Sequence, residues 1–94
     1  MKKPVKPPKP VYTVEITPPA RKQLLALPKE VTDQLRATID NLALEPRPMG
    51  VKKLKGRDGY RVRTGNYRIM YSIFDKVLVV EVVKVGTRGN FYDE

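Results

Sequence analysis

The chain has 94 residues, and its 19 lysines and arginines against 10 acidic residues give a formal net charge of +9. It contains neither cysteine nor histidine, which excludes disulfides, thiolate metal sites and the imidazole groups that most often serve acid–base catalysis. The length allows one small domain, and the charge is typical of proteins that bind nucleic acid or an acidic partner. We expect no cofactor and no metal site.

The first ten residues, MKKPVKPPKP, are expected to form a basic, extended tail outside the folded domain. They combine four lysines with four prolines, and proline fixes φ and supplies no amide hydrogen for a helix or sheet. The segment lacks the apolar stretch of a signal peptide, and no run reaches the ~18 apolar residues of a membrane span. A cytoplasmic protein without membrane contact is predicted, with residues 11–94 as its single domain.

A strand and two helices are predicted next. Residues 11–17 alternate between polar and apolar side chains, as in a half-buried strand. Thr17 is suited to cap a helix that begins at Pro18 and ends before Pro28. A second helix is expected over residues 29–44, and so short a break predicts an antiparallel helical hairpin. The apolar stripes of the two helices are formed by Ala20, Leu24 and Leu27, and by Val31, Leu35, Ile39 and Leu42.

The remaining sequence predicts an antiparallel meander. Residues 60–64 and 67–74 alternate as strands on either side of a Gly-Asn turn. Residues 77–85 follow a second tight turn and are apolar at seven of nine positions, which predicts a strand covered on both faces. The predicted fold class is α+β: an N-terminal strand, a helical hairpin and a β-meander, with the helices packed on one face of a small sheet.

Several arginines are predicted to share the sheet face that the helices leave open. Arg61, Arg63 and Arg68 alternate with the apolar residues of two neighbouring strands, so their side chains point away from the core. The segment after the last strand adds Arg88, Phe91 and Tyr92. Guanidinium groups bind phosphate oxygens through two parallel hydrogen bonds, and aromatic rings stack on unpaired bases. Glu81, in the last strand, is expected to neutralise a neighbouring arginine rather than to act as a base.

The run KLKGRDGYRVRTGNYRIMYSIFDKVLVVEVVKVGTR resembles the RelE branch of the RelE/ParE toxin superfamily. The shared pattern is K-L-x-G, then Y-R-x-R, then G-x-Y-R-h-x-Y with h apolar, and an apolar strand that ends in V-G-x-R. With the preceding strand and hairpin, the resemblance covers residues 11–92. It implies the RelE-like microbial RNase fold and a small basic toxin paired with an antitoxin. RelE-type members cut messenger RNA in the ribosomal A site without a metal. The ribose 2′-hydroxyl attacks the adjacent phosphate and leaves a 2′,3′-cyclic phosphate and a 5′-hydroxyl.

The resemblance also implies roles for individual residues. Arg61 and Arg63 stand where close relatives have lysines, and Arg68 matches the phosphate-binding arginine of the family. Arg88 matches the arginine that stabilises charge and helps to protonate the leaving oxygen, and Tyr92 matches a tyrosine that orients the substrate. Arginine does not serve as a base because its guanidinium group stays protonated in proteins. The group that removes the 2′-hydroxyl proton is therefore either Tyr92 or a group supplied by the ribosome.

The expected partners are the 70S ribosome with its messenger RNA, and a cognate antitoxin through which the complex also meets operator DNA. Contacts with RNA or the ribosome are predicted for Lys52, Lys53, Lys55, Arg57 and Phe91. Two alternatives stay open. One is a ParE-like toxin that inhibits DNA gyrase without catalysis. The other is a weakly active relative whose main role is to bind its antitoxin.

Overall fold

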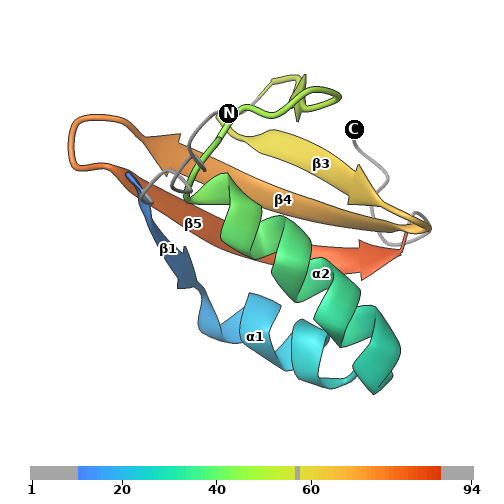
Figure 1. The fold of residues 1–94 in the computed structure, drawn as a ribbon. Helices are drawn as coiled ribbons and strands as arrows, with labels where there is room; N and C mark the ends of the chain where they lie inside the picture. Colours follow the sequence, from blue (N-terminus) through green and yellow to red (C-terminus); the bar gives the residue numbers. More distant parts are fainter. Residues whose placement is uncertain (1–10, 57, 88–94) are drawn as a thin grey trace, which may run out of the picture.

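The protein is built from a five-stranded mixed sheet and two helices (Figure 1). The structure, a computed structural model, describes residues 11–56 and 58–87. The strands are β1 (Thr13–Ile16), β2 (Lys52–Lys53), β3 (Tyr60–Thr64), β4 (Tyr67–Phe74) and β5 (Val79–Thr87), and the helices are α1 (Pro18–Leu25) and α2 (Lys29–Leu42). This arrangement confirms the predicted α+β fold.

The order of the strands in the sheet is β1-β5-β4-β3-β2. Strands β2 to β5 pair antiparallel, whereas β1 lies parallel to β5 at the edge, with Thr13 opposite Val79. The meander was predicted, but the short strand β2 and the parallel pairing of β1 were not. Because β2 joins the edge of β3, it brings a lysine-rich segment onto the sheet.

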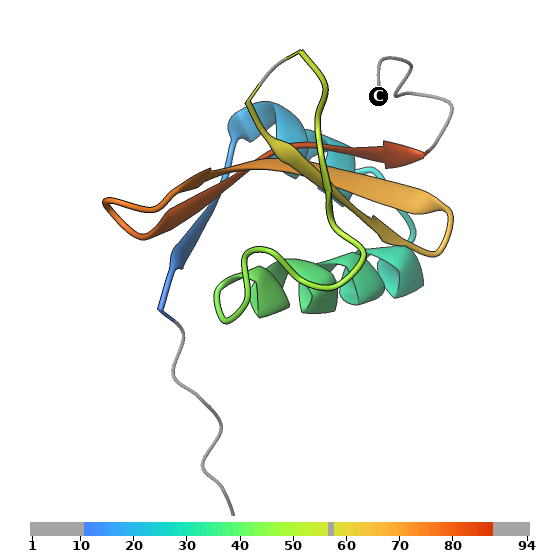
Figure 2. The ribbon, with the colours of Figure 1, turned by 90° about the horizontal axis from the view of Figure 1, so that it is seen from above.

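The two helices begin where the sequence predicts, and each ends about two residues earlier than predicted, at Leu25 and Leu42. The Thr17 hydroxyl oxygen accepts a hydrogen bond from the Ala20 amide at 3.3 Å and so caps α1, and Pro18 is its first residue. After Pro28, α2 runs back across one face of the sheet (Figures 1 and 2). No described helix covers the opposite face of β3 and β4.

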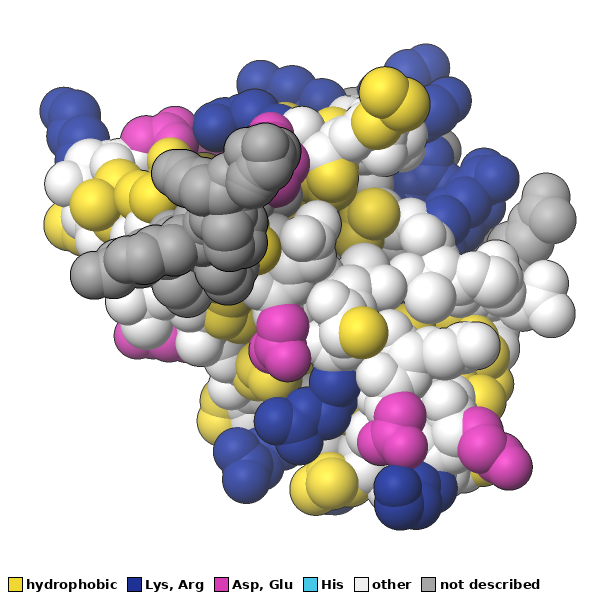
Figure 3. Space-filling model, viewed as in Figure 1, with side chains coloured by type: hydrophobic (Ala, Val, Ile, Leu, Met, Phe, Trp, Pro, Cys, Tyr) yellow, Lys and Arg dark blue, Asp and Glu magenta, His cyan; other side chains and the backbone are white. Residues whose placement is uncertain are grey.

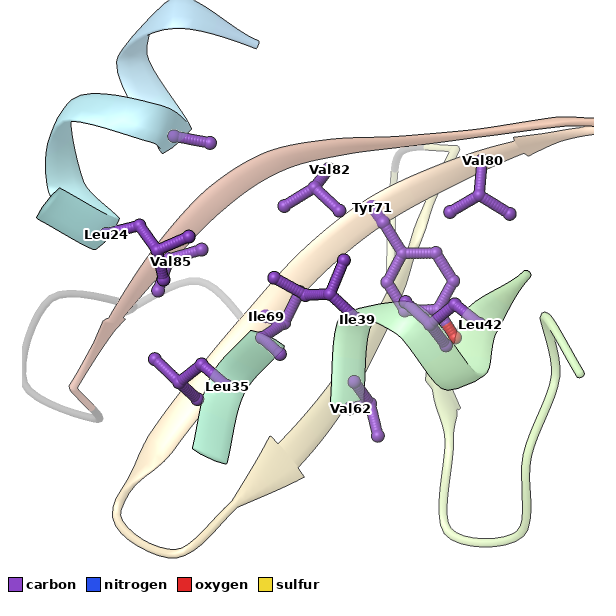
Figure 4. Packing of buried hydrophobic residues seen from close by; sticks show 11 residues of the cluster. Leu24, Leu35, Ile39, Leu42, Val62, Ile69, Tyr71, Val80, Val82 and Val85 are labelled. Carbon is purple, nitrogen blue, oxygen red and sulfur yellow. The ribbon is translucent and has the colours of Figure 1, made fainter. Parts of the chain in front are cut away.

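The core lies between the sheet and the helices. Leu35, Ile39 and Leu42 of α2 face Val62, Ile69 and Tyr71 of the sheet (Figure 4). Val80, Val82 and Val85 complete the sheet side, and Ala20 and Leu24 of α1 pack beside them. The Tyr71 ring is fully buried, and its hydroxyl donates a 2.7 Å hydrogen bond to the Pro46 carbonyl. Burial raises the pKa of Tyr71 well above its usual value, which keeps this hydroxyl protonated.

Helix α1 completes the edge of β5 where β1 ends. The last residue of β1, Ile16, pairs with Val82, so the edge amides beyond this point have no strand beside them. The Gln23 side-chain oxygen of α1 accepts a 2.8 Å hydrogen bond from the Val85 amide. A helix side chain therefore replaces the strand hydrogen bond that β1 is too short to make.

The strand predicted over residues 77–85 differs from the observed β5. Val77 and Leu78 belong to the loop between β4 and β5 and are 67% and 42% exposed. A register shift opposite Met70 and Tyr71 leaves Val83 bulged, with 37% of its surface exposed. The prediction that this strand is covered on both faces was therefore wrong, because only its helix-facing valines are buried. Leu78 has a φ of 56° and closes the loop in a conformation that is unfavourable for leucine.

Asp75 holds three distant segments together. Its carboxylate accepts a 2.6 Å hydrogen bond from the Tyr12 hydroxyl and bonds of 2.9 and 3.3 Å from the Arg47 guanidinium. Arg47 also lies over the ring of Tyr60, 5.2 Å from its centre. The start of the chain, the loop after α2 and the β4–β5 loop thus share one carboxylate.

The described helices include none that is long and apolar enough to span a bilayer.

Replacing Tyr71 by phenylalanine is expected to lower the free energy of unfolding by about 1–2 kcal/mol, because the buried Pro46 carbonyl loses its donor. Urea denaturation of the wild type and the variant measures the difference. Tyr67→Phe is the matched control, because the Tyr67 hydroxyl has no hydrogen-bond partner among the described residues. Equal stability of the two variants would show that the Tyr71 hydrogen bond does not stabilise the fold.

Stability should depend on the charge of Asp75 at acidic pH. The hydrogen bonds from Arg47 and then Tyr12 lower the pKa of Asp75 below its ordinary value of 3.8. Its contribution is therefore fully present above pH 3.8 and is lost as the pH falls through the lowered folded-state pKa. We expect Asp75→Asn to be less stable than the wild type at pH 7 and the two proteins to converge in acid. A difference that stays constant from pH 7 to pH 2 would contradict this role.

Candidate nucleic-acid interface

The alternation of side chains along β3 decides which residues meet the core and which do not. Val62 is buried under α2, and the Thr64 hydroxyl lies 2.8 Å from the Thr38 hydroxyl of α2. Since successive side chains point to opposite faces of a strand, Arg61 and Arg63 are directed to the face without a helix. We call this side of the sheet the open face.

The register brings the predicted arginines together in neighbouring rows on the open face. In one row Arg63 of β3 stands opposite Arg68 of β4, which pairs with Gly86 of β5. In the next row Arg61 lies between Lys52 of β2 and Met70 of β4, and Met70 is opposite Lys84. The prediction that Arg61, Arg63 and Arg68 share one face is confirmed.

The three arginines differ in exposure. Arg63 is exposed, whereas Arg61 and Arg68 retain only 6% and 8% of their surface. Neither of these two is without a partner, as expected for a guanidinium removed from water. Arg61 and Arg68 are thus held in place, while Arg63 is free to meet a ligand in solvent.

Each row adjoins a hollow in the surface. A pocket of about 220 Å³ is lined by Lys52, Lys53, Leu54, Lys55 and Arg61, and we call it the lysine pocket. A smaller hollow of about 50 Å³ lies at the β3–β4 turn and is lined by Arg63, Gly65, Asn66, Tyr67 and Arg68. We call it the arginine hollow. The chemistry of both linings favours an anion, because guanidinium and ammonium groups donate charge-assisted hydrogen bonds.

A small apolar cluster on the open face was missed from the sequence. Leu54 packs on Met70, separately from the main core, and each is less than a tenth exposed. The Leu54 amide donates a 3.0 Å hydrogen bond to the Gly59 carbonyl, which folds the segment back on itself. Lys52 and Leu54 are two residues apart and share the face on which Arg61 lies, but this placement depends on the pairing of β2 with β3, which the sequence did not predict.

Gly59 makes this packing sterically possible. Its φ is 137°, a backbone conformation that other residues rarely adopt. A Cβ at this position would lie 3.0 Å from Leu54 Cδ1 and 3.3 Å from the Tyr71 carbonyl oxygen. A side chain here would push Leu54 away from Met70 and loosen the lysine pocket.

Two carboxylates occupy the open face on the side of β5 and β1. Glu81 lies opposite Ser72 of β4 and beside Glu15 of β1 in the register. The prediction that Glu81 neutralises an arginine was wrong: it makes no ion pair with any described residue. The cause is the register, which places Glu81 two strands and one row away from Arg61 and one strand and two rows away from Arg68. The basic side chains of the open face therefore gather over β2, β3 and the Arg68 end of β4, with Lys84 on β5, while the two carboxylates lie further along β5 and on β1.

The opposite face of the molecule has a mixed character. Figure 3 shows this side, with basic and acidic side chains interspersed and the basic ones most dense along the upper rim. The predicted site residues Arg57, Arg88, Phe91 and Tyr92 lie outside the described residues. In the part of the chain that the structure describes, no group of three acidic side chains is placed to hold a metal ion.

The chain matches known toxins over most of its length. Residues 14–92 match the family described as ParE toxin of type II toxin-antitoxin system, parDE. The toxin RelG of Mycobacterium tuberculosis is 31% identical over 86 residues, which covers 86% of this chain and 95% of RelG. Among solved structures, the fold is similar to the archaeal RelE–RelB complex from Pyrococcus horikoshii, with a TM-score of 0.75, 36% identity, and coverage of 86% of this chain and 99% of that one. The isolated Escherichia coli RelE toxin gives a TM-score of 0.71 at 29% identity, over 81% of this chain and 83% of that one.

The cross-strand pair Arg63–Arg68 should destabilise the protein in the absence of a ligand, because like charges stand directly opposite each other. We expect Arg63→Gln to raise the free energy of unfolding by about 0.2–1 kcal/mol at low salt, and less at 0.5 M salt. Denaturation curves at two salt concentrations test this. The control is Arg36→Gln on the exposed side of α2, which makes the same change in net charge. A loss of stability in Arg63→Gln would refute the repulsion.

Proposed function

Since this chain belongs to the RelE/ParE superfamily and is a RelE-like toxin of a type II toxin–antitoxin system, we propose that it is a ribosome-dependent endoribonuclease that cuts messenger RNA in the A site. The observation that carries the proposal is the convergence of Arg61, Arg63 and Arg68 on a sheet face that no described helix covers. A phosphodiester is the ligand that such a face suits best.

Positive charge is the main requirement of the proposed reaction. The 2′-hydroxyl loses its proton and attacks the neighbouring phosphorus, and the bond from phosphorus to the 5′-oxygen of the next nucleotide breaks. The leaving oxygen takes up a proton, so the products are a 2′,3′-cyclic phosphate and a 5′-hydroxyl. Negative charge accumulates on the non-bridging oxygens in the transition state, where preorganised cations stabilise it.

The arginines have distinct proposed roles. Arg68 is held by its surroundings and lines the arginine hollow, so it binds the non-bridging oxygens of the cleaved phosphate. The exposed Arg63 lies opposite it and adds a second guanidinium to the same phosphate. Arg61, in the next row, adds its positive charge to the electrostatic potential at the phosphate. Arg88 neutralises the leaving oxygen, and Tyr92 orients the substrate or accepts the 2′-hydroxyl proton.

The ribosome has a definite part in this scheme. Arginine does not accept the 2′-hydroxyl proton at neutral pH. A substrate strand held in the A site also has its reacting atoms aligned, which lowers the entropic barrier to attack. Ribosomal binding thus supplies the orientation, and the basic segment that includes Lys52, Lys53, Lys55 and Arg57 holds the toxin to RNA phosphates. Phe91 adds a stacking contact.

An antitoxin is the second proposed partner. The similar structures include RelE–RelB complexes from Pyrococcus horikoshii and Escherichia coli. The net charge of +9 favours an antitoxin whose contacting segment is acidic, and an acidic segment laid over the open face would exclude RNA. The same complex would meet operator DNA through the antitoxin. Affinity that falls with rising salt is expected of such a cover.

The description of the matching family, which names ParE, favours one other function. A ParE-like toxin would inhibit DNA gyrase by binding and would not need the arginines to converge. A gyrase supercoiling assay therefore belongs beside the cleavage assay.

In a purified translation reaction on a defined message, we expect cuts within codons that require ribosomes and that Arg88→Ala reduces by at least 100-fold, because the leaving oxygen loses its cation. Primer extension maps the cuts. Arg36→Ala on the exposed side of α2 is the control and should cut like the wild type. Untouched translation together with blocked gyrase supercoiling would replace the nuclease proposal by the ParE-like function.

A further inference from the structure

The open face has two hollows lined by basic side chains, and the proposed function assigns the cleaved phosphate to only one of them. We propose that the lysine pocket binds the phosphate next to the one held at Arg63 and Arg68, so that the open face takes an RNA segment with two successive phosphates. This inference rests on the proposed function only for the assignment of the cleaved phosphate to the arginine hollow.

The lining of the lysine pocket is suited to a phosphate with part of its ribose. Lys52, Lys53, Lys55 and Arg61 contribute four cations to a volume of about 220 Å³. None of the residues that line the pocket is acidic, so its lining carries a strongly positive potential. The aliphatic side chain of Leu54 forms the remaining wall, against which the non-polar edge of a ribose can pack.

The spacing of the two hollows matches a single RNA strand. Arg61 and Arg63 point to the same face two residues apart on β3, about 6.6 Å along the strand. Arg61 lines the lysine pocket and Arg63 the arginine hollow. Successive phosphates of an extended strand are separated by a comparable distance, so one strand can place a phosphate in each hollow.

Leu54 keeps the lysine pocket assembled before RNA binds. Its contact with Met70 lies apart from the main core and fixes the lysine segment to the sheet. Without this contact β2 would be held by only two paired residues, and mutual repulsion would move its lysines away from Arg61. Leu54 is therefore a positioning residue: it adds no charge but holds four charges within reach of one phosphate.

The carboxylates end the basic surface on the side of the lysine pocket. The row of the open face that follows Arg61 and Met70 contains Ser72, Glu81 and Glu15, and it offers no cation among the described residues. Beyond it lie Phe74 and Val79, which are apolar. A third phosphate placed in this row would lie beside the carboxylates of Glu81 and Glu15, which repel it. The surface that attracts phosphate therefore ends at the lysine pocket.

The test is the salt dependence of binding for RNA of increasing length. Uncleavable 2′-O-methyl oligomers of two, three and six nucleotides carry one, two and five internal phosphates, and fluorescence anisotropy measures their affinity without ribosomes. Each bound phosphate adds about −0.7 to the slope of log K against log salt concentration. We expect slopes near −0.7, −1.4 and −1.4. A slope that continues to grow from three to six nucleotides would overturn the two-phosphate site.

Variants distinguish binding in the lysine pocket from non-specific attraction to the net positive charge of the protein. Leu54→Ala should bring the trinucleotide slope back to about −0.7 with all cations retained, whereas the exposed Leu25→Ala should leave it near −1.4. If Leu54→Ala does not fold, Lys52→Gln combined with Lys55→Gln should give the same reduction. An unchanged trinucleotide slope in a folded variant with the pocket altered would refute the assignment.

A further pair of variants tests whether the carboxylates of Glu81 and Glu15 end the RNA-binding surface. Glu81→Gln should steepen the slope for the hexanucleotide but not for the trinucleotide, and Glu30→Gln on α2 should change neither. Equal effects of the two substitutions would refute the boundary. Because these measurements need no cleavage, an inactive toxin with the expected slopes would refute the nuclease proposal alone. Normal cleavage with other slopes would refute only this inference.

Discussion

The pleat of β3 and β4 is the constraint on which the rest of the molecule depends. Every second residue of these strands packs under α2, and the residues between them are forced to the other side. The core and the basic surface are therefore two sides of one pattern. A slip of one residue in the pairing would bury guanidinium groups against α2 and expose Ile69 and Tyr71, so the hydrophobic effect that fixes the register also fixes the positions of the arginines.

This coupling explains why the protein tolerates unfavourable charge interactions. Arg63 faces Arg68 across the strands, and the lysine pocket gathers four cations. Both arrangements oppose folding, but the buried core stabilises the sheet that imposes them. The small cluster of Leu54 and Met70 has the same function locally, because it offsets the repulsion of the segment it holds. The same charges thus lower the stability of the free protein and raise its affinity for an anionic ligand.

The periodicity of the sequence predicted most of the fold and the common face of the three arginines. The helices, the Thr17 cap of α1 and the meander follow from local patterns, and so does the shared face of Arg61, Arg63 and Arg68. The parallel pairing of β1 and the strand β2 depend on contacts between distant segments, and a two-residue strand has too short a pattern to recognise. The role expected of Glu81 failed for a related reason. Which residue lies beside it depends on cross-strand register, and the bulge at Val83 alters that register.

The parallel pairing of β1 with β5 has a consequence for the order in which the molecule can be made. Thr13 pairs with Val79, which is synthesised 66 positions later (79 − 13). Because β5 lies between β1 and β4, β1 has no partner strand before β5 is synthesised. Pairings so distant in sequence also form slowly. The strand β1 therefore stays without its partner until β5 has been made, whereas the strands β2, β3 and β4 that carry the arginines can pair beforehand.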